Sequence, residues 1–196
     1  MSDSTCDPGR SDAPPAGWPC HQPVDRSINR ANYAHLPRHS LQVCASLVQN
    51  PANLGGLCRT AEAFRLEKLI LADMAITRHP LFRNLAVSTH QWQPLAACSI
   101  AQLPTWLAQQ TQIGYTVIGL DADPLAIPLP QFQFPLRSIL LLGQELTGLP
   151  ASLATHCQVC ITIPQWGLVE SLNVQTAGAI AMYAYIQQRS LPNITA

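Results

Sequence analysis

Residues 137–150 read RSILLLGQELTGLP, and this stretch decides the predicted fold. Residues 139–142 form a continuous apolar run, which is typical of a strand buried on both faces of a parallel sheet. The run ends at Gly143, and the polar residues Gln144 and Glu145 follow it. Open α/β sheets bind ligands at the carboxyl ends of their parallel strands. The stretch therefore predicts a buried parallel strand with candidate site residues at its end, although Glu145 could also be an ordinary surface glutamate in a loop.

Strands and helices are expected to alternate on both sides of this stretch. Further apolar runs that predict strands lie at 41–48, 68–73, 95–99, 115–120 and 158–164. Helical stretches are expected at 53–64, 80–87, 100–111, 150–155 and 172–188. This alternation predicts an α/β fold, with a mostly parallel sheet and helices on both of its faces.

The chain is expected to consist of one domain and two tails. Residues 1–38 contain six prolines and no apolar periodicity, which predicts a flexible Pro-rich N-terminal tail. Residues 39–190 form the predicted domain, and 191–196 form a short C-terminal tail. The locally basic part of the first tail, 26–39, could contact a phosphate backbone or could be a solvated linker.

The composition excludes several classes of protein. With 47% apolar residues in 196, the chain can form a hydrophobic core. Lys+Arg and Asp+Glu each number 11, and this zero net charge argues against a nucleic-acid binder held mainly by charge. No apolar run approaches the length of a membrane span, and the first residues lack the apolar core of a secretory signal. We therefore expect a cytoplasmic protein with no membrane partner.

Cysteines and histidines do not predict a metal or disulfide site. Seven cysteines in a chain of this size are not the even set of a small secreted scaffold. Cys157 and Cys160 form a single Cys-x-x-Cys, whereas a zinc ribbon needs a second pair. In a strand these two thiols would point to opposite faces, so we expect small buried thiols. The six histidines share no metal-ligand spacing, and no metal is expected.

A second candidate segment is NPANLGGLCRT at 50–60. Asn53 is a plausible N-cap for the helix that follows. Gly55 and Gly56 lie early in that helix, where glycine is unfavourable, so some group is expected to approach the backbone closely there. Arg59 lies one turn after Gly55 on the same face. A helix start with these residues is a reasonable place for a phosphate, although the pattern alone is weak.

A third segment, ITIPQWGLVESLNVQTAGAIAMYA, covers 161–184. A strand is expected to end at Ile163, and a loop then leads to Ser171 and Asn173 at the start of the last helix. In isolation Ser171 could simply be an N-cap and Asn173 a polar residue of the first turn. Four residues at helical spacing predict core or oligomer packing, namely Val174, Ala177, Ala181 and Tyr185.

Together, in this order, the three segments resemble the SpoU/TrmH family of RNA ribose 2′-O-methyltransferases. The family's first motif, an Asn-rich turn that ends in Arg, is matched by 50–60. The second, apolar-Gly-x-Glu-x-x-Gly-apolar, is matched by 142–149, and the third, Ile-Pro followed by Ser-Leu-Asn-Val, by 163–174. The resemblance covers about 41–189. HQWQPL at 90–95 and the 138–150 segment look most like the catalytic domain of the eukaryotic TAR-RNA-binding-protein type, which methylates a D-loop guanosine of tRNA.

The resemblance implies a C-terminal deep trefoil knot, a homodimer formed through the last helix, and S-adenosylmethionine as the cofactor. Implied cofactor-binding residues are Leu120, Gly143, Ile163, Ser171 and Leu172. Implied catalytic residues are Asn53, Arg59, Glu145, Ser171 and Asn173. We expect Arg59 to grip the phosphate beside the target ribose, because a guanidinium does not lose its proton in proteins, and Glu145 to fix Arg59 or nearby backbone.

The expected partner is structured RNA, most plausibly tRNA. Besides Arg59, cationic residues available for phosphates include Arg65 and Arg83, together with Lys68, Arg78 and Arg137. Three alternatives stay open: the same chemistry on ribosomal RNA or a tRNA wobble nucleotide, a knotted dimer that binds RNA without catalysis, and a purely structural α/β protein.

Overall fold

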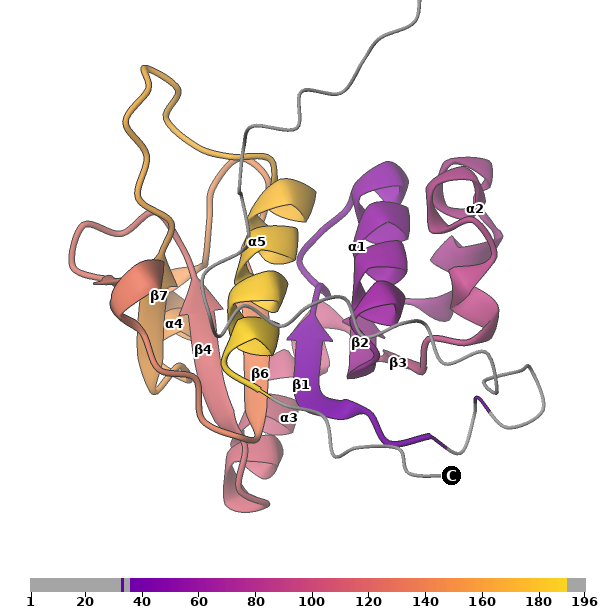
Figure 1. Ribbon diagram of the computed structural model, residues 1–196, viewed down its shortest axis with the longest axis horizontal. Helices are drawn as coiled ribbons and strands as arrows, with labels where there is room; N and C mark the ends of the chain where they lie inside the picture. The colour runs from indigo at the N-terminus through magenta and orange to yellow at the C-terminus, as the bar shows by residue number, and fades with distance from the viewer. Residues whose placement is uncertain (1–32, 34–35, 190–196) are drawn as a thin grey trace, which may run out of the picture. The chain divides into compact units, whose positions relative to one another are not determined.

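The computed structural model describes Tyr33 and residues 36–189 (Figure 1). Most of the predicted N-terminal tail and all of 191–196 lie outside these residues. Seven parallel strands form one sheet in the order β3-β2-β1-β6-β4-β7-β5. The strands are β1 (His39–Cys44), β2 (Leu66–Leu71), β3 (Leu95–Ala97), β4 (Thr116–Leu120), β5 (Ile127–Pro128), β6 (Ser138–Leu142) and β7 (Val159–Thr162). The predicted parallel α/β fold is confirmed, and β6 lies at the centre of the sheet.

The helices alternate with the strands as the sequence pattern predicts. They are α1 (Pro51–Ala63), α2 (Pro80–Ala86), α3 (Leu103–Gln112), α4 (Ala151–Ala154) and α5 (Val174–Gln187). Short 3₁₀ helices lie at Met74–Arg78, Thr89–Gln91, Ile100–Gln102 and Leu129–Gln131. Among the described residues, no helix is both long enough and apolar enough to cross a bilayer. The sequence pattern missed β5, because two residues are too few to show a period.

Each face of the sheet has its own hydrophobic core. Helices α1, α2 and α5 cover one face, where Leu57, Phe82 and Met182 pack on strand residues such as Leu140. Helices α3 and α4 cover the other face and pack on residues such as Ile139. Figure 1 shows α1, α2 and α5 in front of the sheet and α3 behind it. Alternate residues of β6 thus face different cores, which explains its continuous apolar run.

Two helices begin at residues other than those the sequence suggested. The N-cap of α1 is Asn50, not Asn53, and its side chain accepts a hydrogen bond from Ala52 N at 2.9 Å. Pro51 favours this start, because proline has no backbone N–H to leave unsatisfied in the first turn. The N-cap of α5 is Asn173 rather than Ser171, since Asn173 Oδ1 accepts from Gln175 N at 2.9 Å.

The two glycines of α1 are explained by helix packing. A Cβ on Gly55 would collide with the carbonyl oxygen of Phe82 in α2. A Cβ on Gly56 would lie 2.7 Å from Cγ of Gln175 in α5. The close approach predicted from these glycines is therefore made by protein groups rather than by a bound phosphate.

The predicted arrangement of the Cys-x-x-Cys pair is wrong. Cys157 precedes β7, so the strand alternation that would separate its thiol from that of Cys160 does not apply. Both sulfurs instead lie against Gly119, where a Cβ would be 3.1 Å from each. Burial raises the pKa of the Cys157 thiol to about 12 and also raises that of Cys160. Both thiols are therefore protonated and unreactive at neutral pH.

Candidate active site

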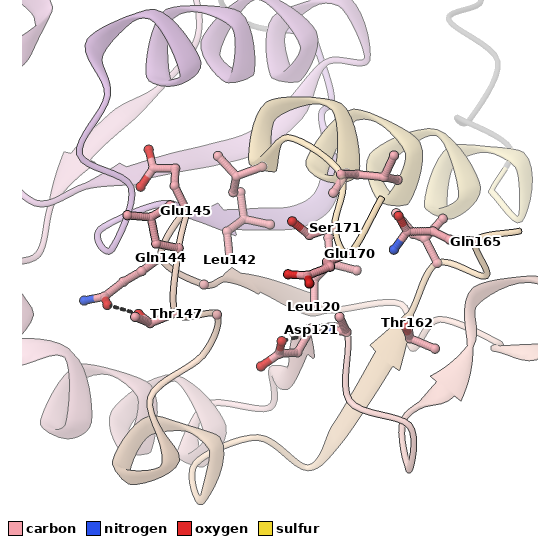
Figure 2. A pocket seen from close by; sticks show the side chains of 18 residues that line it. Leu120, Asp121, Leu142, Gln144, Glu145, Thr147, Thr162, Gln165, Glu170 and Ser171 are labelled. Atoms are coloured by element: carbon pink, nitrogen blue, oxygen red, sulfur yellow. Dashed lines mark hydrogen bonds between the residues drawn. The ribbon is translucent and has the colours of Figure 1, made fainter. Parts of the chain in front are cut away.

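The carboxyl ends of β4, β6 and β7 enclose a cavity of about 320 Å³ together with the start of α5 (Figure 2). Because all strands run in parallel, the residues that follow each of them meet at this edge of the sheet. The cavity lies where the second and third sequence motifs come together. Its size is in the range of ordinary small-molecule sites.

All the residues expected to bind the cofactor line this cavity, and they come from the ends of β4 and β6 and from the connection between β7 and α5. Leu120 ends β4, Gly143 follows β6, Ile163 follows β7, and Ser171 and Leu172 precede α5. The strand ends supply apolar side chains, whereas the connections supply backbone polar groups and carboxylates. An apolar wall with a few polar groups fits a nucleoside-containing ligand.

The second motif folds into a tight loop beside the cavity. Gln144 N donates to Gly148 O at 2.8 Å, and Gly148 N donates back to Gln144 O at 3.1 Å. Gly148 has φ +67, and a Cβ on Gly143 would lie 2.5 Å from the carbonyl carbon of Gly148. The two glycines of this motif are therefore required by the turn itself. Asp121 Oδ2 accepts from Leu149 N at 3.0 Å and holds the loop to the end of β4.

A chain of hydrogen bonds joins the three sequence motifs. Asn53 Nδ2 on α1 donates to Glu145 Oε1 at 3.4 Å. Asn53 Oδ1 accepts from Asn173 Nδ2 at 3.1 Å. Asn173 in turn caps α5 through its Oδ1. Three polar residues separated by up to 120 positions in the sequence are thus brought into direct contact.

Glu145 also holds the backbone at the start of α1. Its Oε1 accepts from Asn50 N at 3.2 Å, and its Oε2 lies 3.5 Å from Gln49 N. A carboxylate is favoured at this place, because the N-terminus of a helix carries partial positive charge. Of the two partners expected for Glu145, the structure gives it nearby backbone and not Arg59. Glu145 also lines the cavity.

The arginines expected to contact RNA lie outside the cavity. Arg59 is exposed on α1, and its side chain makes no hydrogen bond or ion pair with any other described residue. Arg83 is exposed on α2. Arg65 directly precedes β2, at the amino end of the sheet, and therefore lies at the edge away from the cavity. None of these three residues is among those that line the cavity.

Two carboxylates of the site were missed by the sequence reasoning. Asp121 directly follows β4, and Glu170 directly precedes Ser171. Both line the cavity, and Figure 2 shows them with Ser171 on its wall. The position of Asp121 after a buried strand could have identified it, but Glu170 lies in a loop without a pattern. No lysine or arginine is among the cavity-lining residues, and no cluster suited to a metal ion occurs in the described part of the chain.

Comparison with known proteins identifies a family whose sequence profile matches this chain. Residues 40–183 match the profile of the SpoU rRNA Methylase family. The chain is 42% identical over 151 residues to the mouse (Mus musculus) tRNA (guanosine(18)-2′-O)-methyltransferase TARBP1, which covers 77% of this chain and 10% of that protein. It is 34% identical over 161 residues to the Saccharomyces cerevisiae tRNA (guanosine(18)-2′-O)-methyltransferase, which covers 82% of this chain and 11% of that protein. The chain thus spans about a tenth of the length of both relatives.

A solved structure supports the same fold. The SpoU methyltransferase AviRb from Streptomyces viridochromogenes, in complex with the cofactor AdoMet, superposes with a TM-score of 0.66 at 24% identity. The match covers 78% of this chain and 62% of AviRb. The family profile spans both the parallel sheet and the hydrogen-bonded motifs at its carboxyl edge. On this match and the similarity to its relatives, the chain belongs to the SpoU methylase family.

Proposed function

We propose that this chain transfers a methyl group from S-adenosylmethionine to a ribose 2′-hydroxyl of structured RNA. The observation that carries the proposal is the Glu145–Asn53–Asn173 connection beside the cavity, in a chain of the SpoU methylase family. These polar residues unite three distant segments, and packing alone does not require them. The target we propose is a guanosine in the D-loop of tRNA, because both curated relatives described above are named as tRNA guanosine methyltransferases.

The cavity is suited to S-adenosylmethionine. Leu120, Ile163 and Leu172 supply apolar walls for an adenine ring, and the loop around Gly143 brings backbone polar groups to the same space. When bound, the cofactor supplies an electrophilic methyl group. The protein must then hold the ribose oxygen about 3–3.5 Å from that carbon, and such positioning can provide much of the rate.

The residues of the hydrogen-bonded connection would fix the ribose site. Glu145 anchors the start of α1, and Asn53 ties it to Asn173 at the start of α5. In this proposal Ser171 orders the loop at the cavity and faces the ribose. Arg59 grips the phosphate next to the target nucleotide, since its guanidinium is exposed and makes no ion pair with a described carboxylate. Arg83 adds positive charge that can contact the RNA backbone. Arg65 is a weaker candidate for such a contact, because it lies at the edge of the sheet away from the cavity.

The proposal includes a deep trefoil knot. The connection from β4 to β6 contains β5, which pairs with the outer side of β7, so this connection passes outside β7. The chain leaves β7 and returns to α5, whose Gly178 packs against Leu57 of α1 and Leu142 of β6. This path across the carboxyl edge supports a knot in which the segment from β7 to α5 is threaded through the loop at 121–137.

The proposal also includes a homodimer formed through α5. Ile180 and Tyr183 on this helix are 39% and 47% exposed, which is high for large apolar side chains. Light scattering tests this point: the wild-type protein should have twice the chain mass, and Ile180→Glu should shift it toward one chain mass. An unchanged mass for the variant would place the interface elsewhere.

The experiment for the function is methylation of unmodified tRNA transcripts in the presence of S-adenosylmethionine. Mass spectrometry of nuclease fragments should place one methyl group on a D-loop guanosine ribose, and Arg59→Ala should abolish it. Arg59→Lys keeps the charge but loses the two-pronged guanidinium, so it should be strongly impaired. Transfer to ribosomal RNA alone or to a wobble nucleotide would correct the substrate. Binding of RNA without transfer to any of these RNAs would favour the non-catalytic alternative.

A further inference from the structure

Glu170 differs from the other carboxylates that line the cavity. Asp121 accepts from Leu149 N and Ala122 N, and Glu145 accepts from the start of α1. Glu170 makes no hydrogen bond or ion pair with another described residue, although it lines the same cavity. Its charge is therefore not used by the fold around it.

The lining of the cavity contains these three carboxylates and no lysine or arginine. An unneutralised carboxylate on such a wall attracts a cationic ligand and gains nothing from a neutral one. Asp121 and Glu145 keep their charge, but hydrogen bonds fix their oxygens on backbone N–H groups. The Glu170 carboxylate is not held in this way by any described residue, so it can turn toward a bound cation. Figure 2 shows its carboxylate between Ser171 and Asp121.

The proposed reaction changes the charge of the cofactor by one unit. The bond between the methyl carbon and the sulfonium sulfur breaks, the bond from the ribose oxygen to that carbon forms, and the hydroxyl proton leaves to water. The sulfur keeps the bonding electron pair and becomes a neutral thioether. Substrate and product cofactor share every other charged group, so a nearby carboxylate can distinguish them only through the sulfonium.

We propose that Glu170 is the residue that makes the cavity prefer S-adenosylmethionine over its product, S-adenosylhomocysteine. The proposal rests on the methyl-transfer function proposed above. The carboxylate attracts the sulfonium and thereby favours exchange of the product for a new cofactor. Glu170 is adjacent to Ser171, in the loop before α5 that lines the cavity.

Calorimetric titration of the full chain tests this role with three ligands. These are S-adenosylmethionine, S-adenosylhomocysteine and sinefungin, whose amine carries a positive charge near the position of the sulfonium. In Glu170→Gln, both cationic ligands should bind about three- to tenfold more weakly, while S-adenosylhomocysteine binding changes by less than about twofold. The difference should shrink as salt is raised.

Asp123→Asn is the matched control, because Asp123 lies near Asp121 but does not line the cavity. Its side chain accepts from Leu125 N at 2.8 Å, and asparagine can keep that bond. The control should leave all three affinities unchanged, and Glu170→Asp should keep most of the preference. Thermal unfolding of each variant verifies that the fold is intact.

Two outcomes would overturn the proposal while leaving the proposed function intact. An equal loss of affinity for all three ligands would show that Glu170 shapes the loop and does not distinguish the ligands by charge. Unchanged affinities would show that its carboxylate lies too far from the sulfonium. Failure of the wild-type protein to bind S-adenosylmethionine would instead overturn the proposed function together with this proposal.

Discussion

The two edges of the parallel sheet carry different sets of charged residues. Arg38, Arg65 and Arg137 each stand directly before a strand, so they gather at the amino edge. Asp121 and Glu145 follow strands, so they lie at the carboxyl edge. A chain with zero net charge is therefore far from neutral locally. Net charge alone says little about where an anionic or a cationic ligand can bind.

The two edges also use their charges differently. At the amino edge, Arg38 Nη2 pairs with Glu62 at 3.1 Å, and Arg137 stacks over the Tyr115 ring at 4.2 Å. At the carboxyl edge, the carboxylates hold backbone N–H groups or face the cavity. We infer that the amino edge stabilises the fold and that the carboxyl edge carries the activity.

The largest expected effect is that of Glu145→Gln on methyl transfer. The variant keeps one acceptor oxygen but loses the charge that holds the start of α1 and Asn53. Hydrogen bonds to charged groups contribute roughly 1.5–3 kcal/mol, which corresponds to a rate lower by about 10- to 100-fold. Single-turnover methylation of tRNA at saturating cofactor measures this. A wild-type rate for this variant would show that the Glu145 charge has no role in methyl transfer.

Glu62→Gln should lower the stability of the fold and leave methyl transfer unchanged, the reverse of Glu145→Gln. It breaks the ion pair with Arg38, whose side chain is only 13% exposed, and should lower the free energy of unfolding by about 1–3 kcal/mol. Methyl transfer per folded molecule should stay at the wild-type level. Urea unfolding combined with the same assay tests the pair of variants. If Glu62→Gln lost activity at unchanged stability, the assignment of stability to the amino edge and activity to the carboxyl edge would be wrong.

Asn173 connects the two roles, and two substitutions separate them. Asn173→Ala removes the cap of α5 and should cost about 0.5–2 kcal/mol of stability. Asn173→Asp keeps an acceptor for Gln175 N but cannot donate to Asn53. We therefore expect Asp to restore stability and not activity. Restoration of both by Asp would mean that the bond to Asn53 is dispensable.

The smallest expected effect concerns pH. Burial, followed by the charges of Arg65 and Arg189, lowers the pKa of His39. The folded protein therefore binds this proton less readily than the unfolded chain, and stability should fall as pH drops below about 6.5. Urea midpoints at neutral and mildly acidic pH measure the loss. His39→Gln should show a smaller loss over the same interval, and an equal loss would assign it to other groups.

The central part of the fold could be predicted from the sequence because its patterns are local. The apolar run of β6 and the alternation around it depend only on neighbouring residues. The two-residue strand β5 could not be predicted, since it exists only through pairing with β7. The position of the Cys157 thiol likewise depends on where β7 begins, which the sequence pattern did not fix.

The site could be predicted in outline and not in detail. The family motifs identified Glu145, Asn53 and Asn173, and the structure adds that they touch one another. The N-cap of α1 was misplaced by three residues, because Asn50 and Asn53 both suit a cap and only Pro51 decides between them. Glu170 was missed because it stands out only by lacking a hydrogen-bond partner or ion pair beside the cavity. That can be seen only in the folded chain.

Amide NMR shifts during titration with S-adenosylmethionine test the central claim most directly. We predict perturbations at the carboxyl edge, in Leu120, Asp121, Gly143 and the residues around Ser171, with Arg38, Arg65 and Arg137 unaffected. Perturbations centred on the amino edge, or none at a saturating concentration of the cofactor, would contradict it.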